Sequence, residues 1–179
     1  TYKVISSDSH RAHGTNPSAV IFDELHAQSQ SELWEAMTTG SGARSQPLIC
    51  AITTAGYDRH SICYQQHEYA TKVRDGIIED SSFLPVLFCL EDGEDWTTKK
   101  TWKRVMPNLG VTVPLEYMQK ECEKAKNLPS FENVFRRLYL CQWTEQSVRW
   151  LQMSAWDDCA TAVDPEALRG RTCFAGIDL

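Results

Sequence analysis

Short apolar runs bounded by turn residues recur along the chain, and each has the length of a strand buried in a parallel sheet. Five runs are predicted to be strands, at residues 2–6, 19–23, 47–53, 84–90 and 172–178. Pro85 restricts the fourth run to a strand start or a sheet edge, because proline cannot donate a hydrogen bond to a neighbouring strand. Helical patterns separate the runs, so the chain is predicted to have an α/β fold with a parallel sheet.

Two helices are predicted between the strands, over residues 29–38 and from Asp58 to about residue 75. Ser29 or Ser31 is the expected N-terminal cap of the first helix, and Asp58 that of the second. Further along the chain the pattern changes, and three successive helices with basic faces are predicted at residues 97–105, 114–126 and 130–142. This change indicates an α-helical subdomain after the sheet.

The run at residues 19–23 ends in two adjacent carboxylates, Asp23 and Glu24. In open α/β sheets, ligands bind at the carboxyl ends of the strands. Nucleotide-hydrolysing enzymes use such a pair to hold Mg²⁺ and to orient or deprotonate the attacking water. The alternative is that the two acids only begin the next helix, where negative charge is favourable.

The next run ends in the sequence Thr53, Thr54, Ala55 and Gly56. Small hydroxyl residues and a glycine at a strand tip let the backbone approach a phosphate or its attacking water, and in ATPase motors such a segment reports the γ-phosphate state to moving parts. The alternative is a strand-to-helix turn that needs a glycine. Two such tips together are more specific than either alone, and we expect them to lie close in space at one edge of the sheet.

Composition narrows the class of protein. With 179 residues, 42% of them hydrophobic and 23% charged, and a net charge of −6, the chain fits an ordinary globular protein of one domain or one domain plus a piece of another. No apolar run approaches the ~20 residues of a membrane span, and no signal-peptide pattern is present. Seven scattered cysteines without a CxxC pair argue against a disulfide scaffold or a zinc ribbon and favour reduced thiols in a cytoplasm.

Charge is unevenly distributed along the chain. Residues 97–149 hold ten basic and five acidic side chains, so this segment is positive in an acidic protein. The asymmetry predicts contact with a polyanion, and the alternative is a solvated helical face with salt bridges.

A few histidines and arginines are further candidates for chemistry. His10, His13 and His26 invite a zinc interpretation, but no cysteine or carboxylate stands at ligand spacing, so zinc is not expected. Arg11 and Arg44 are candidates for an arginine that stabilises the transferred phosphoryl group, and Arg11 is preferred because it precedes the strand that ends in the two carboxylates. The alternative for both is a surface arginine. The six tryptophans are expected to be packing anchors.

In their order and spacing, several blocks of the sequence resemble the large terminase subunits of tailed bacteriophages and prophages, the ATP-driven motors that package viral DNA. The blocks are VIFDELHA, RSQPLICAITTAGYD, LYLCQWT, WLQMSAWDDC and CFAGIDL. The resemblance implies a P-loop (RecA-like) ATPase sheet that lacks its N-terminal Walker A part, followed by an α-helical linker subdomain and the first strand of an RNase H-like nuclease. The implied domain limits are residues 1–95, 96–170 and 171–179.

The resemblance also implies roles for individual residues. Asp23 and Glu24 become the Walker B pair, with Asp23 binding Mg²⁺ and Glu24 acting in catalysis together with Arg11. A coupling motif that contacts ATP is implied for three residues, Thr53, Thr54 and Gly56. Asp178 becomes the first metal-binding carboxylate of a nuclease that uses Mg²⁺ or Mn²⁺.

Two features depart from the family pattern. No GxxxxGK[ST] phosphate loop occurs in the chain, so the Walker A segment is expected upstream of Thr1 in a protein roughly twice as long. Such a piece is expected neither to hydrolyse ATP nor to cut DNA unaided. Cys141 stands where these terminases often have asparagine.

The implied partners are double-stranded DNA, the small terminase subunit, the portal protein and further copies of the same subunit in a homo-oligomeric ring. The implied location is the cytoplasm of the bacterial host, with no membrane partner. Two alternatives remain from the residues themselves. DELH also matches the box of a DExH helicase, and the basic segment also suits a non-enzymatic DNA-binding or assembly module.

Overall fold

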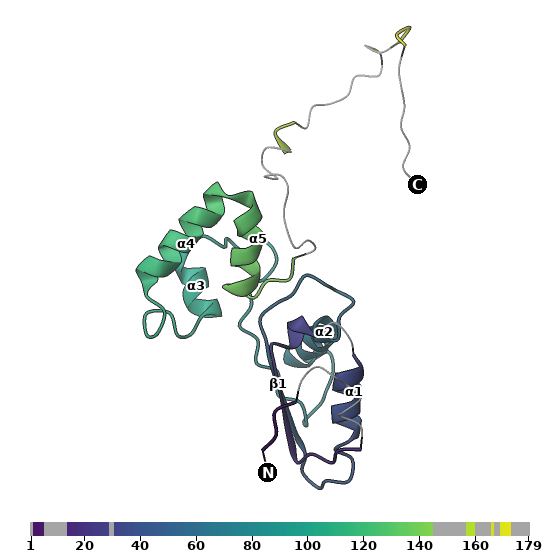
Figure 1. Ribbon diagram of the computed structural model, residues 1–179. Coiled ribbons are helices and arrows are strands. Elements are labelled where there is room, and N and C mark those ends of the chain that lie inside the picture. Colours follow the sequence, from purple (N-terminus) through teal and green to yellow (C-terminus); the bar gives the residue numbers. More distant parts are fainter. Residues whose placement is uncertain are drawn as a thin grey trace. The chain divides into compact units, whose positions relative to one another are not determined.

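The computed structural model describes residues 2–5, 14–28, 31–144, 157–159, 166 and 169–172. It divides the chain into two compact units, Thr1–Arg149 and Trp150–Leu179. All the labelled strands and helices belong to the first unit (Figure 1). In the second unit, the described residues include an ion pair between Arg169 and Glu166, with 2.6 Å between nitrogen and oxygen.

Two parallel strands form the sheet, β1 at Ala19–Asp23 and β2 at Leu48–Ile52. Parallel neighbours need a crossover connection, and here a 3₁₀ turn, η2 (Leu25–Ala27), and helix α1 (Glu32–Thr39) supply it. The strands pair without offset, from Ala19 opposite Leu48 to Asp23 opposite Ile52. Both carboxyl ends therefore meet at one edge, which confirms the expected proximity of the two strand tips.

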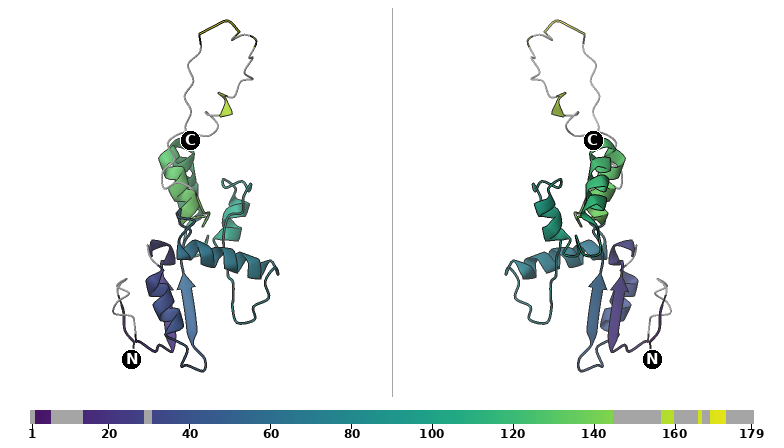
Figure 2. Two further views of the ribbon diagram at one scale, coloured as in Figure 1. Left: turned by 90° about the vertical axis from the view of Figure 1, so that its right-hand side faces the viewer. Right: turned by 90° about the vertical axis from the view of Figure 1, so that its left-hand side faces the viewer.

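One face of this sheet is covered and the other is open. Helix α1 presents Leu33, Ala36 and Met37 at helical spacing, and they pack with Phe22 of β1 in a small core. Figure 2 shows α1 lying alongside the two strands. Side chains on a strand alternate between faces, so the open face carries Ile21, which is 61% exposed, together with Leu48 and Ile52 of β2.

The structure corrects two of the predicted strands. Residues 2–5 belong to no strand, and neither do residues 84–90. In the second segment every second residue is apolar, but these side chains are not buried. Leu84, Val86 and Phe88 are all exposed to solvent. Pro85 removes a ladder donor there, and no strand among the described residues pairs with the segment. The predicted strand at residues 172–178 lies outside the described residues except for Thr172.

Ser61, and not the predicted Asp58, caps the second helix, whereas Ser31, one of the two serines predicted for the first helix, stands at its start. Helix α2 covers Ile62–Arg74, and the Ser61 hydroxyl oxygen accepts a hydrogen bond from the backbone N–H of Tyr64 at 3.3 Å. Asp58 instead accepts from the backbone N–H of His60 at 2.8 Å, so it closes the turn before the helix. Ser31 holds the cap position of α1, but its side chain makes no capping hydrogen bond.

Three further helices form the helical region, α3 at Lys99–Val105, α4 at Leu115–Asn127 and α5 at Pro129–Leu138. They enclose a second core, whose buried members are Leu90, Trp102, Val105, Leu109, Met118, Cys122, Ala125, Phe135 and Leu140. The three predicted helices are confirmed, although α5 ends four residues early. The longest helices, α2 and α4, have 13 residues each, and no described helix is long and apolar enough to cross a membrane.

Candidate functional site

The candidate site lies at the carboxyl edge of the sheet. Asp23 is the last residue of β1, Glu24 follows it, and the side chains of both are exposed. Thr53 and Thr54 follow β2 at the same edge, because Asp23 pairs with Ile52. The acidic groups after β1 and the hydroxyl groups after β2 therefore lie at the same edge of the sheet, as the sequence predicts.

Glu24 has a left-handed backbone conformation, with φ 50° and ψ 53°. A residue with a Cβ atom adopts this conformation at a cost of about 1–2 kcal/mol. The sharp turn stops the strand and starts η2, and the backbone N–H of Ala27 closes it by donating to the Glu24 carbonyl at 2.8 Å. Such strain clusters at functional sites, so the conformation of Glu24 is itself a signal that the sequence does not display.

His26 connects the two strand tips. Its backbone N–H donates to Oγ1 of Thr53 at 3.0 Å. Its ring nitrogen Nδ1 lies 3.0 Å from Oε2 of Glu24, 3.1 Å from Oγ1 of Thr53 and 3.4 Å from Oγ1 of Thr54. Sequence reasoning considered this histidine only as a zinc ligand and missed the bridge. His26 follows Glu24 by two residues in a short turn, which keeps its side chain near the strand tips. This spacing is the signal from which the bridge could have been predicted.

The segment after β2 is in contact with residues that follow α5. A Cβ atom added to Gly56 would lie 3.0 Å from Cζ3 of Trp143, so a larger residue would press against that ring. Trp143 also meets Tyr64 of α2 edge to face, with 4.9 Å between ring centroids. The backbone N–H of Ala55 bonds to the sulfur of Cys141, whose thiol pKa is raised by burial. Residues from the LYLCQWT block therefore pack directly on the TTAG segment, and the role of Trp143 as a packing anchor is confirmed.

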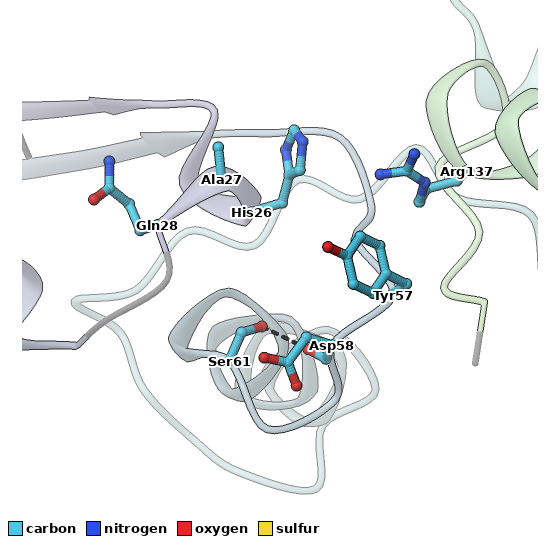
Figure 3. Close-up of a pocket in the computed structure, with 8 residues that line it drawn as sticks. His26, Ala27, Gln28, Tyr57, Asp58, Ser61 and Arg137 are labelled. Carbon is cyan, nitrogen blue, oxygen red and sulfur yellow. Dashed lines mark hydrogen bonds between the residues drawn. The ribbon is translucent and has the colours of Figure 1, made fainter. Parts of the chain in front are cut away.

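A cavity of about 350 Å³ adjoins this edge (Figure 3). It is lined by His26, Ala27, Gln28, Gly56, Tyr57, Asp58, Ser61 and Arg137. The volume is within the range of small-ligand pockets. The Arg137 guanidinium lies 5.5 Å from the centroid of the Tyr57 ring, so α5 contributes a cation to the cavity. The sequence shows the basic character of α5 but not that Arg137 reaches this edge.

One further predicted candidate, Arg44, is described by the structure and lies away from this edge. Arg44 lies in the loop before β2, and its guanidinium donates to the carbonyl oxygen of Asn16 at 2.8 and 3.1 Å. That loop is at the amino end of the strands, the opposite end from Glu24. Arg11 and Asp178 lie outside the described residues.

Comparison with known proteins decides the family. The family model for the terminase large subunit ATPase domain matches residues 1–72, and the model for the terminase large subunit endonuclease domain matches residues 77–179. The second match alone covers more than half of the chain. The chain belongs to the large terminase subunit family.

Individual relatives agree with this family. Protein YmfN of Escherichia coli (strain K12) is 30% identical over 167 residues, which is 93% of this chain and 37% of YmfN. The terminase large subunit of Enterobacteria phage HK97 is 28% identical over 99% of this chain and 34% of its own length. The terminase large subunit of Lactococcus phage p2 is 28% identical over 75% of this chain and 25% of its own length.

A solved structure supports the α/β terminase fold. The crystal structure of the HK97 bacteriophage large terminase matches with a TM-score of 0.63 and 27% identity, covering 82% of this chain and 30% of that one. This terminase chain thus spans 25–37% of the length of these relatives. Both family matches are to terminases, and they do not support the helicase alternative.

The sheet edge also fits the cofactor that an ATPase family implies. Mg²⁺ prefers oxygen ligands, and it is typically bound through one or two carboxylates plus substrate phosphates. Asp23, Glu24 and Thr53 place two carboxylates and a hydroxyl at one exposed edge. Among the described residues, no group of three or more histidine, cysteine, aspartate and glutamate side chains could hold a metal.

Proposed function

We propose that this chain carries the Walker B and coupling half of a large terminase ATPase, whose ATP hydrolysis drives double-stranded DNA into the procapsid, and the start of the metal-dependent endonuclease that cuts the concatemer. One observation above all supports the proposal. The carboxylate of Glu24 and the hydroxyl of Thr53 lie at one sheet edge and share His26 as a common neighbour.

Each residue of the edge has a separate proposed role. When bound, Mg²⁺–ATP supplies the phosphoryl group and the cation that neutralises its developing charge. Asp23 holds the Mg²⁺ shell, and Glu24 orients a water molecule and accepts its proton. The coupling contacts with ATP are made by Thr53, Thr54 and Gly56.

The remainder of the ATP site belongs, in this proposal, to a part of the protein outside residues 1–179. The chain contains no GxxxxGK[ST] phosphate loop. The open face of the sheet carries apolar side chains such as Ile21 and Leu48, each 61% exposed, which further strands of the same protein would bury. The relatives are long enough to contain that part, since the chain spans only 25–37% of them.

The remaining roles follow from the family. Arg11 is proposed to reach the nucleotide of a neighbouring subunit in a homo-oligomeric ring, with the portal protein and the small terminase subunit as partners. Asp178 is proposed as the first carboxylate of a nuclease site that uses Mg²⁺ or Mn²⁺. In the full-length protein, Asp178→Ala should remove DNA cleavage and spare ATP hydrolysis.

The test of the ATPase proposal is Glu24→Gln in the full-length protein. Loss of the carboxylate removes the proton acceptor, so kcat for ATP should fall by about 10²–10⁴-fold. ATP affinity should change little, because Asp23 remains. Glu32→Gln, an equivalent change at an exposed residue of α1, is the matched control and should be neutral. Wild-type turnover in the Glu24→Gln protein would refute the proposal.

A further inference from the structure

We propose that His26 is a positioning residue: its ring N–H holds the Glu24 carboxylate in its working orientation and ties it to the hydroxyl of Thr53. The inference rests on the proposed ATPase function and assigns a role at that same site. It starts from the three contacts of Nδ1, which join the tip of β1 to the tip of β2.

The hydrogen bonds decide which ring nitrogen carries the proton. The Thr53 hydroxyl donates its own proton to the carbonyl oxygen of Thr54 at 2.8 Å, and it accepts from the backbone N–H of His26. An ionised carboxylate can only accept. The two nearest neighbours of Nδ1 are therefore acceptors, so Nδ1 is the protonated nitrogen and donates to Oε2 of Glu24 at 3.0 Å.

Burial explains why Glu24 needs this bond. The Glu24 side chain is 55% exposed, and the His26 side chain is 19% exposed. An exposed glutamate samples several rotamers, whereas the His26 ring is held by its burial and by its contact with Oγ1 of Thr53. His26 thus gives an exposed carboxylate a fixed partner.

The bond also links the two strand tips mechanically. Any shift of Thr53 moves the backbone of His26 through one hydrogen bond and its ring through the other. The ring in turn moves the Glu24 carboxylate. A displacement of about 1 Å at a catalytic group can cost about 10²-fold in rate, so small shifts of the TTAG segment would switch the carboxylate in or out of position.

The test compares three variants of the full-length protein. In His26→Asn, the amide nitrogen can take the place of Nδ1 and donate to Glu24. In His26→Gln, the amide reaches the position of Nε2, and in His26→Phe the ring remains without a donor. Removing an orienting partner typically costs about 10–100-fold, so kcat for ATP should fall by this factor in His26→Phe and His26→Gln. The KM for ATP should stay unchanged, and His26→Asn should keep most of the wild-type kcat.

A second readout does not depend on turnover. Histidine-selective ¹⁵N NMR of the full-length protein should show His26 with a protonated Nδ1, and this signal should move in Glu24→Gln and not in Glu32→Gln. A protonated Nε2 with a bare Nδ1, or His26→Asn as slow as His26→Phe, would overturn the inference. Failure of the ATPase proposal gives a different result. The Glu24→Gln protein would then hydrolyse ATP at the wild-type rate, independently of the results for the His26 variants.

Discussion

The sheet region and the helical region of this chain differ in how completely they bury their apolar side chains. In the helical region, Met118, Phe135 and Leu140 have no exposed surface at all. In the sheet region, Ile21 and Leu48 are each 61% exposed on the open face of the strands. The residues of the proposed ATPase edge, such as Glu24 and Thr53, belong to the region that buries its apolar side chains less completely.

The cause of the difference is the range of the contacts that each region needs. Helices α4 and α5 are joined by Leu128 alone and pack on each other, so their core forms from neighbours in the sequence. A sheet of two strands is marginally stable in water and depends on further strands or helices. We therefore expect the helical region to be stable within this chain and the sheet region to depend on the rest of the protein.

The largest expected effect is in the helical core. Phe135→Ala should lower the free energy of unfolding by about 3–5 kcal/mol, because it leaves a cavity in a core that cannot collapse fully. Leu138→Ala, at a 41% exposed position on the same helix, is the control and should cost far less. Urea denaturation followed by circular dichroism measures both. Equal costs would mean that the helical core is not closed.

The contact between the two regions should give the next largest effect. Gly56→Ala forces a methyl group against the Trp143 ring and should cost about 1–3 kcal/mol. Gly42→Ala is the matched control, because its nearest atom would lie 3.6 Å away. Thermal unfolding of the two variants compares them, and Trp143→Leu should relieve most of the Gly56→Ala penalty. Additive effects of the two changes would show that the ring does not press on Gly56.

A smaller effect is expected at Cys141, which has a positive φ of 50°. Asparagine tolerates this left-handed conformation better than other residues with a Cβ atom. Cys141→Asn should therefore stabilise the chain by up to about 1 kcal/mol. Cys122→Asn, at a buried helical position, should instead destabilise the chain, because it buries a polar amide without relieving backbone strain. Melting temperatures of the two variants show whether the effect at position 141 comes from the backbone conformation or from the polarity of asparagine.

The smallest effect is expected on the open face of the sheet. Ile21→Thr should change the unfolding free energy of this chain by no more than about 0.5 kcal/mol, because the side chain is mostly in water. In the full-length protein the same change should cost more, since the proposal buries that face. Chemical denaturation of both proteins provides the comparison, and a neutral result in the full-length protein would mean that the face stays open.

Sequence patterns were sufficient to predict where the helices and the two paired strands form, but not which other segments pair when they are far apart in the sequence. The apolar runs that became β1 and β2 each end in the predicted polar residues, so the meeting of Asp23 with the TTAG segment followed from parallel pairing alone. The run at residues 84–90 carries the same pattern, but no strand in the part of the chain that the structure describes pairs with it, and a pattern cannot reveal whether a partner is present.

The missed parts of the site depend on contacts between residues far apart in the sequence. His26 meets Thr53 across 27 positions, and Trp143 covers Gly56 from beyond the last helix. Neither contact leaves a periodic signal in the sequence. The left-handed backbone conformation of Glu24 also cannot be predicted from the sequence, because glutamate is not a residue that is enriched at such positions.

Residue-resolved hydrogen exchange can show whether the proposed ATPase edge lies in a region that depends on the rest of the protein. In residues 1–179 alone, amides of α4 and α5 should exchange slowest, and those of β1 and β2 should exchange faster through local opening. In the full-length protein with bound Mg²⁺–nucleotide, the β1 and β2 amides should become as protected as the helices. Full protection of β1 and β2 in residues 1–179 alone would mean that the sheet does not depend on the rest of the protein.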